Sequence, residues 1–125
     1  KNNVLLFKTG HENIDKVIPA KHRGNISGAM FNLGYLPKGD KNIATCKETT
    51  VEALKKILPF LRKEGIVTIV VYTGHPGGKE EKDAVIDFVK NLSQKYCDVL
   101  LYRYLNQIND APFLIAIRKL HGDSF

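Results

Sequence analysis

The chain has 125 residues, enough for one domain with a hydrophobic core, and 43% of them are hydrophobic. Its formal net charge of +6 favours acidic partners such as nucleic acid, although a solvated lysine-rich surface explains the charge equally well. No apolar run approaches membrane-spanning length and no secretory signal is visible, which argues against a membrane protein.

The first 25 residues predict a strand followed by a short helix. Val4–Lys8 is a short apolar run of the kind that forms strands. A turn is expected over residues 10–13, then a weak helix over residues 14–18 that ends at Pro19.

Ile26–Leu33 is the stretch around which the chain is organised. It is apolar without polar alternation, which predicts a central strand buried on both faces. Gly34 and Pro37 end it, because glycine adopts unusual dihedrals and proline fixes its own φ. The break leaves the amide of Asn32 at the carboxyl end of the strand, followed by Tyr35. Ligands of open parallel sheets bind at this edge, so we expect the site here.

The middle of the chain predicts a helix and then a second buried strand. Thr49 or Thr50 is expected to cap the helix, which kinks or ends near Pro59 and closes at Gly65. Ile66–Tyr72 is a continuous β-branched run, typical of a strand covered on both faces.

The last third predicts a helix and two strands. The helix covers residues 79–92, and the strands cover Asp98–Leu105 and Pro112–Lys119. Too few residues separate these strands for a crossover helix, so they form an antiparallel hairpin. Alternating strands and helices predict a single α/β domain over residues 1–125, with helices on the faces of a mostly parallel sheet.

Asn32 and Tyr35 form the sharpest candidate site. An uncharged amide can accept a hydrogen bond from a substrate amine, and a tyrosine ring can stack on a flat base for about 1–3 kcal/mol. A turn in which Asn32 caps backbone and Tyr35 fills the core is equally consistent with the spacing.

The glycine-rich stretch Gly74–Lys79 is similar to a phosphate loop. Thr73 and Glu80 stand where the Walker pattern needs glycine and Ser/Thr, so a plain strand-to-helix connection is favoured. Lys79 can still assist an anion there, and His75 is the stronger site candidate.

The remaining polar candidates have ordinary explanations. His11 and Glu12 can face a ligand or begin a helix, and Asn106 lies in an amide-rich loop best explained as a turn. No zinc spacing is present. Cys46 and Cys97 are isolated, which predicts free thiols and a reducing, cytoplasmic compartment.

Four motifs occur in a specific order: FNLGYLPKGDK, TTVEAL, VYTGHPGGKEEKDAV and YRYLNQINDAPFLIAIRK. Together they resemble the second half of the rRNA methylase family, which includes enzymes that methylate the aminomethyl group of a tRNA wobble uridine. The similarity covers residues 10–119.

This resemblance implies a Rossmann-like class I methyltransferase fold that uses S-adenosylmethionine and ends in an antiparallel hairpin. It implies that Asn32 and Tyr35 hold the methyl-accepting nitrogen, with His11 and Glu12 near the adenosine end. The complete expected set is, for catalysis, Asn32 and Tyr35; for the cofactor, His11, Glu12, Asn32 and Leu33; and for the substrate, Tyr35, Pro37, His75, Lys79 and Asn106.

The family begins with a strand, a glycine-rich cofactor loop, a helix, and a strand ending in a ribose-binding acid. This sequence contains none of them, so its first expected strand corresponds to the third of the family fold. The 125 residues are expected to hold about half of a cofactor site. A missing preceding segment, a truncated product, and a homodimer that completes the open sheet edge all remain open.

The favoured function is S-adenosylmethionine-dependent methylation of RNA, at an aminomethyl nitrogen of a tRNA wobble uridine. The alternative is a non-catalytic RNA-binding or assembly module, which would bind tRNA in a salt-sensitive way without affinity for the methyl donor. A hydrolase-like enzyme using His75 is a weaker third option, because no nucleophile is paired with it.

Overall fold

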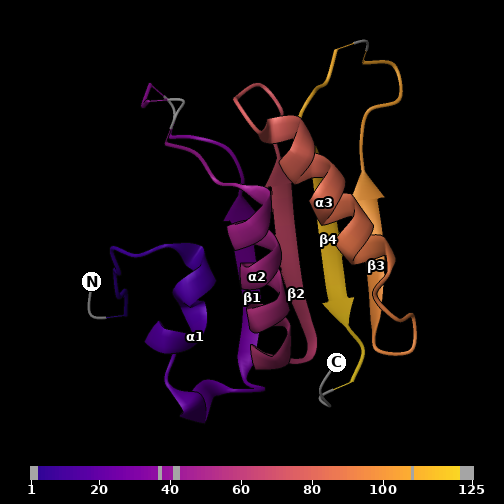
Figure 1. The fold of residues 1–125 in the computed structure, drawn as a ribbon. Coiled ribbons are helices and arrows are strands. Elements are labelled where there is room, and N and C mark those ends of the chain that lie inside the picture. The colour runs from indigo at the N-terminus through magenta and orange to yellow at the C-terminus, as the bar shows by residue number, and fades with distance from the viewer. Residues whose placement is uncertain (1–2, 37, 41–42, 108, 122–125) are drawn as a thin grey trace.

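Four strands form one mixed sheet in the order β1-β2-β4-β3 (Figure 1). The computed structural model describes residues 3–36, 38–40, 43–107 and 109–121. The helices and strands are, in chain order, η1 (His11–Asn13), α1 (Ile14–Val17), η2 (Ala20–His22), β1 (Ile26–Asn32), α2 (Lys47–Ile57), η3 (Leu58–Phe60), β2 (Leu61–Val71), α3 (Gly78–Lys90), β3 (Cys97–Tyr102) and β4 (Phe113–Lys119).

The strand pairings bring several connecting loops to one edge of the sheet. β1 and β2 are parallel, joined by a crossover through α2. β4 runs antiparallel to both β2 and β3, which confirms the predicted C-terminal hairpin; among the described strands only the β1–β2 pair is parallel, so the sheet is mixed where a mostly parallel one was expected. The carboxyl ends of β1 and β2 therefore lie at the same edge as the loop between β3 and β4 (Figure 1).

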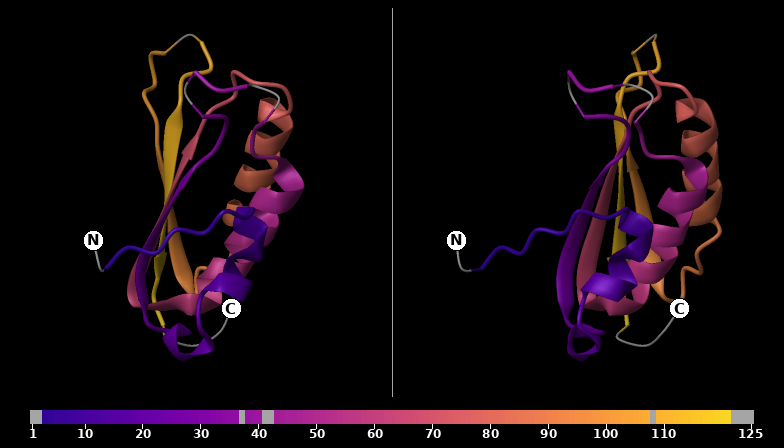
Figure 2. Two further views of the ribbon diagram at one scale, coloured as in Figure 1. Left: turned by 90° about the vertical axis from the view of Figure 1, so that its left-hand side faces the viewer. Right: turned by 60° about the vertical axis from the view of Figure 1, so that its left-hand side comes forward.

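The helices pack on one face of the sheet only, among the residues described (Figure 2). On β1, Phe31 points to that face and is 7% exposed, whereas Met30 points the other way and is 86% exposed. The prediction that Ile26–Leu33 is a central strand buried on both faces is therefore wrong. β1 has one described neighbour, β2, and no described layer covers its second face.

The uncovered face carries apolar side chains across all four strands. The pairing register sets Met30 beside Thr68, Thr68 beside Ala116, and Ala116 beside Leu100. Ile66 and Tyr102 are further exposed residues of these strands. The core lies on the other face, where α2 and α3 bury aliphatic residues of β2 and β4.

The expected N-terminal strand at Val4–Lys8 is absent. Residues 4–8 are extended but unpaired, and they run away from the domain (Figure 2). Leu6 is among the most exposed of the large hydrophobic residues described. An apolar run becomes a strand only when a neighbouring strand takes its backbone hydrogen bonds, and no described strand lies beside this one. The short helix expected before Pro19 is present as η1 and α1.

The boundaries of α2 differ from the prediction at both ends. The helix begins at Lys47 after Cys46, and neither Thr49 nor Thr50 is its N-cap. Its early end near Pro59 is confirmed, because the last turn tightens into η3. Gly65 does not close a helix but lies within β2.

Lys119, the last residue of β4, closes the core at the end of the sheet opposite to the carboxyl ends of β1 and β2. It is 1% exposed, and its ammonium donates to the carbonyls of Leu58 at 3.1 Å and Leu61 at 2.8 Å. Leu58 begins η3 and Leu61 begins β2, so Lys119 binds the short segment that joins α2 to β2. Burial of the Lys119 ammonium is tolerated because it donates hydrogen bonds to these carbonyls.

None of the helices described is long and apolar enough to cross a membrane.

Replacing Lys119 tests how strongly this closure stabilises the domain. Lys119→Met keeps the aliphatic stem but removes the donors, so we expect the free energy of unfolding to fall by about 1–3 kcal/mol. Lys55→Met, at an exposed position on α2, should change it little. Urea denaturation measures the free energy of unfolding of each variant, and an equal decrease in the two variants would contradict the role given to Lys119.

Candidate functional site

The loop after β1 forms the centre of the candidate site. The amide of Leu33 still pairs with the carbonyl of Val70 at 2.9 Å, and the chain then turns at Gly34. Gly34 has a φ of 127°, a conformation that other residues rarely adopt. Tyr35 then pairs with Ala44 in an isolated antiparallel bridge. The end of the strand predicted from Gly34 is confirmed.

A hollow of about 350 Å³ opens beside this loop. It is lined by Asn32, Leu33, Tyr35, Tyr72 and Gly74. The side chain of Asn32 is exposed and has no hydrogen bond to another described residue. The hollow thus combines an amide available to a ligand with two tyrosines, at the carboxyl ends of parallel strands.

A second hollow of about 490 Å³ is lined by residues that include His11, Glu12, Gly34 and Thr45. Its lining shares no residue with that of the first hollow, so His11 and Glu12 do not line the same space as Asn32. The ring of His11 lies 5.7 Å from that of Phe31. Burial lowers the pKa of His11, and the negative charges of Glu12 and Glu81 partly oppose this effect.

A buried carboxylate lies beneath the loop. Glu81 is 0% exposed, and its oxygens accept hydrogen bonds from the hydroxyls of Thr45 at 2.9 Å and Thr50 at 2.6 Å. Thr45 in turn accepts a hydrogen bond from the amide of Gly34 at 2.8 Å. Thr50 contacts Nε2 of His11 at 3.3 Å. One carboxylate of α3 therefore joins the loop, α2 and η1.

His75 fills the space beside this network. Its side chain is fully buried, and neither ring nitrogen has a hydrogen-bond partner among the described residues. Nε2 lies 3.7 Å from Oε1 of Glu81, and the ring meets that of Tyr35 edge-on at 5.9 Å. His75 thus supports the loop from beneath and is not among the residues that line either hollow.

The other expected substrate residues lie elsewhere. Lys79 is exposed and bonds Asp83 at 3.1 Å, an interaction that raises its pKa. Asn106 lies in the exposed β3–β4 loop and lines neither hollow. Pro37 lies outside the described residues.

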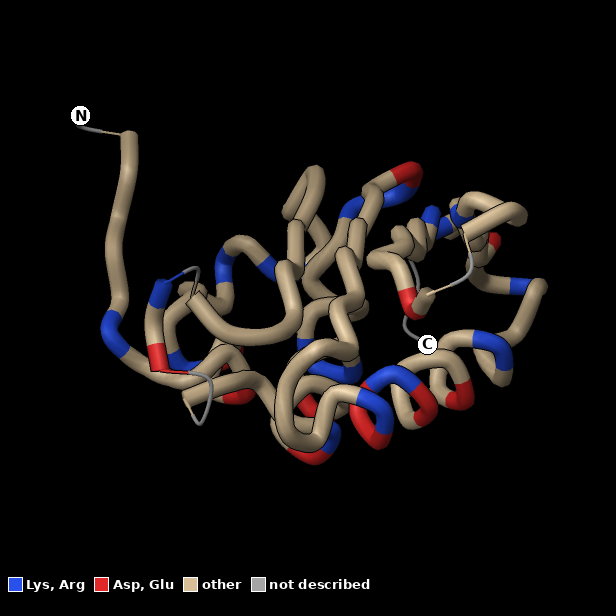
Figure 3. The backbone as a smooth tube through the Cα atoms, turned by 90° about the horizontal axis from the view of Figure 1, so that it is seen from above, with Lys and Arg blue, Asp and Glu red and all other residues tan. Residues whose placement is uncertain are grey.

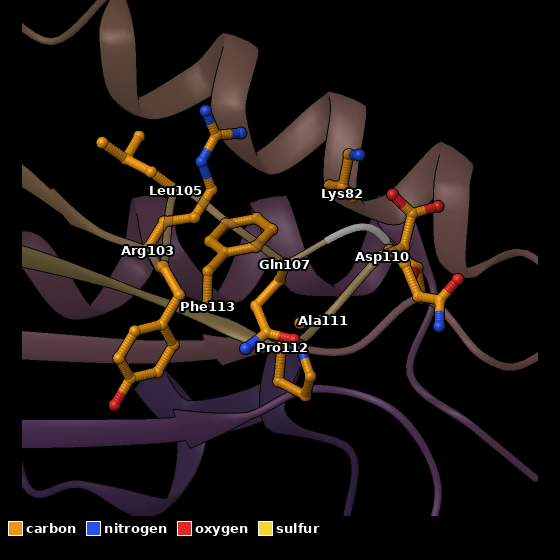
Figure 4. A pocket seen from close by; sticks show the side chains of 11 residues that line it. Lys82, Arg103, Leu105, Gln107, Asp110, Ala111, Pro112 and Phe113 are labelled. Atoms are coloured by element: carbon orange, nitrogen blue, oxygen red, sulfur yellow. The ribbon is translucent and has the colours of Figure 1, made fainter.

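A third pocket, of about 240 Å³, lies between α3 and the β3–β4 loop (Figure 4). Lys82 reaches it from α3, and Arg103 and Asp110 reach it from the loop region (Figure 4). Neither Lys82 nor Arg103 has a hydrogen bond or ion pair with another described residue. Tyr104 and Phe113 add aromatic rings to the lining.

Charge elsewhere on the molecule is mixed, because both basic and acidic residues lie along the helices when the molecule is viewed from above (Figure 3).

Sequence reasoning missed the buried hydrogen-bond network beneath the loop and the two cations of the third pocket. Glu81 stands in the first turn of α3, where an acid is ordinarily explained by the helix dipole. Thr45 lies outside every helix and strand, and Thr50 was expected as a helix cap. The two pocket cations, Lys82 and Arg103, carry no local motif.

The family model described as "Putative rRNA methylase" matches residues 1–118. The chain belongs to this family. It is 41% identical over 119 residues to the Arabidopsis thaliana "tRNA (mnm(5)s(2)U34)-methyltransferase, chloroplastic". The match covers 95% of this chain and 42% of that relative.

Solved structures agree in fold. A "putative rRNA-methylase" from Clostridium thermocellum superposes with a TM-score of 0.88 at 43% identity, covering 95% of this chain and 62% of that one. A "putative methyltransferase" from Streptococcus mutans, solved in complex with SAH, gives a TM-score of 0.78 at 46% identity over 90% of this chain and 58% of that one. The expected Rossmann-like methyltransferase fold is confirmed, and the chain spans between two fifths and two thirds of the length of each of these relatives.

No group of three or more His, Cys, Asp or Glu residues suited to a metal ion occurs in the described part of the chain. Cys46 and Cys97 are free thiols, as predicted.

The turn at Gly34 allows a direct test of the loop conformation. A Cβ at Gly34 would meet Tyr72 and His75 at ordinary contact distances of 3.6 and 3.7 Å, so the φ of 127° is the obstacle. Gly34→Ala should lower the free energy of unfolding by about 1–3 kcal/mol. Gly74→Ala, where a Cβ meets nothing within 4 Å, should not. Equal effects in urea denaturation would show that the turn at Gly34 is not strained.

Proposed function

We propose that this protein acts in the S-adenosylmethionine-dependent methylation of RNA, at an aminomethyl nitrogen of a tRNA wobble uridine. The observation that carries the proposal is the available amide of Asn32 beside a tyrosine-lined hollow, in a chain of the rRNA methylase family. The name of the Arabidopsis relative supports a tRNA wobble position, and the SAH complex of the Streptococcus protein supports the cofactor.

The residues at the end of β1 fit the methyl-bearing part of S-adenosylmethionine. The hollow beside Asn32 offers a neutral amide and aromatic walls, and no acidic residue of the described chain lines it. Such a lining suits a positively charged sulfonium group. Asn32 and Leu33 would contact the cofactor there, and His11 and Glu12 of the second hollow are proposed contacts of its adenosine part. When bound, the cofactor supplies a methyl group activated by positively charged sulfur.

Asn32 and Tyr35 are the proposed catalytic residues. The amide oxygen of Asn32 can accept a hydrogen bond from the substrate amine, which aims the nitrogen lone pair at the methyl carbon. The amine must be neutral to attack, and an uncharged amide does not favour its protonated form as a carboxylate would. The exposed part of Tyr35 can stack on the base. Positioning of the two reactants supplies most of the rate.

The central experiment is a methyl-transfer assay with labelled S-adenosylmethionine and tRNA that carries 5-aminomethyl-2-thiouridine. We expect transfer by the parent protein and a loss of about 100-fold in Asn32→Ala, because the amine loses its orientation. Asn25→Ala is the matched control, since Asn25 lies just before the opposite end of β1 and should leave the rate unchanged.

Failure of that assay has a defined meaning. Salt-sensitive tRNA binding without methyl transfer or affinity for the cofactor would overturn the enzymatic proposal. It would instead favour the second candidate, an RNA-binding or assembly module, which the charge of +6 also fits. The free thiols of Cys46 and Cys97 support a reducing compartment, such as the cytoplasm, for either role.

The pocket between α3 and the β3–β4 loop is the proposed contact for the RNA backbone. Lys82 and Arg103 line it without partners among the described residues, whereas Lys79 is engaged by Asp83. The β3–β4 loop that lines this pocket lies at the end of the sheet where β1 and β2 finish (Figure 1), so an RNA strand bound in the pocket can continue toward the methyl-accepting base.

Charge neutralisation tests this contact. Lys82→Gln combined with Arg103→Gln should weaken RNA binding and reduce the slope of log K against log salt by about 0.7–0.9 for each phosphate that is no longer neutralised. Lys63→Gln combined with Lys95→Gln makes the same change in net charge at the opposite edge and should leave the slope nearly unchanged. Equal reductions in both pairs would show that only overall charge matters.

A further inference from the structure

The carboxylate of Glu81 is the fully buried acid of the described chain that no step of the proposed reaction uses. We propose that Glu81 is a positioning residue for methyl transfer, which acts through Thr45 on Gly34 and so fixes the orientation of Asn32 and Tyr35. This inference rests on the proposed function. Glu81 is fully buried and cannot contact a substrate, so its proposed effect on methyl transfer is indirect, through the hydrogen bonds beneath the loop.

The hydrogen bonds along this path have a defined direction. A threonine hydroxyl has one proton, and Thr45 commits it to Oε1 of Glu81 at 2.9 Å. Its lone pairs are then available to the amide of Gly34, which donates at 2.8 Å. The backbone amide of Thr45 returns a hydrogen bond to the carbonyl of Gly34, also at 2.8 Å. Both peptide groups that flank the α-carbon of Gly34 are therefore held by the same residue.

The two hydrogen bonds with Thr45 affect the site through the backbone conformation of Gly34. It lies between Leu33 and Tyr35, and its φ of 127° sets the direction in which the chain leaves β1. A glycine has unusual rotational freedom, so an external restraint is needed to select one conformation. Because Asn32 precedes this turn and Tyr35 follows it, the conformation of Gly34 sets how these two lining residues of the hollow are placed relative to each other.

The same carboxylate has a second branch that leads away from the loop. Thr50 donates to Oε2 at 2.6 Å and belongs to α2, where its neighbour is His11. The ring of His75 approaches Oε1 at 3.7 Å. Thr45 and Thr50 thus make equivalent hydrogen bonds to one buried group, but of these two threonines it is Thr45 that passes the restraint to Gly34.

The two branches provide a matched pair of variants. Thr45→Val and Thr50→Val each remove one hydroxyl from Glu81 at nearly constant volume, so both should lower stability to a similar degree. Thr45→Val should also speed hydrogen exchange at the Gly34 amide and reduce kcat by roughly 10- to 100-fold with little change in KM for S-adenosylmethionine. Thr50→Val should leave Gly34 exchange and kcat close to those of the parent. Thr45→Ser, which keeps the hydroxyl, should restore both quantities and serves also if Thr45→Val does not fold.

The outcomes separate this inference from the proposed function. Parent protein that transfers no methyl group refutes the proposed function, and with it the catalytic consequence of the network. Unchanged Gly34 exchange in Thr45→Val refutes the coupling from Glu81 to the loop, whatever the enzymatic result. Equal losses of kcat in Thr45→Val and Thr50→Val would show that Glu81 contributes general stability only.

Discussion

A buried carboxylate needs hydrogen-bond donors, and the way in which Glu81 obtains them organises the site. The donors come from Thr45 and Thr50, on either side of the start of α2. Since Glu81 itself belongs to α3, satisfying it fixes two helices and the loop after β1 relative to one another. An apolar residue in its place would remove the need for these donors and leave the loop without its link to the helices.

The fold and the site depend on each other through the parallel pair of β1 and β2. Their pairing sets Asn32 beside Val70, and the loops that follow the two strands then meet at one sheet edge. The antiparallel β4 returns the β3–β4 loop to that edge, where Lys82 and Arg103 line a pocket. A methyl-acceptor site and an RNA-backbone contact are thereby proposed within one continuous edge, which suits a substrate that is a strand rather than a small molecule.

The sequence predicted those features that depend on neighbours along the chain. The C-terminal hairpin followed from the short connection between two apolar runs, and the end of β1 followed from Gly34. The prediction failed where a strand needs a neighbouring strand or layer that the described residues do not supply. Val4–Lys8 has the composition of a strand but no described strand to pair with, and Met30 belongs to an apolar run yet faces a side that no described layer covers.

The candidate site divides in the same way. Asn32 and Tyr35 could be proposed from the sequence because a polar residue after an apolar strand is visible there, and both line one hollow in the structure. Glu81 lies many residues beyond the loop that it holds, and its position in a first helical turn has a sufficient local explanation. Long-range hydrogen bonds of this kind leave no periodic signal. Likewise the sequence suggested Lys79 as a site residue because it follows a glycine-rich turn. The role proposed for Lys82 becomes evident only when the structure shows the β3–β4 loop beside it.

The central claim is that the hollow at the end of β1 binds the methyl donor and also the product that the donor leaves behind. Titration of the isotopically labelled protein with S-adenosylhomocysteine, followed by amide chemical shifts, tests it most directly. The account predicts saturable shifts concentrated at residues 32–35 and 72–75, and their loss in Asn32→Ala. Saturating ligand that leaves these amides unshifted, or that shifts a different surface instead, would contradict it.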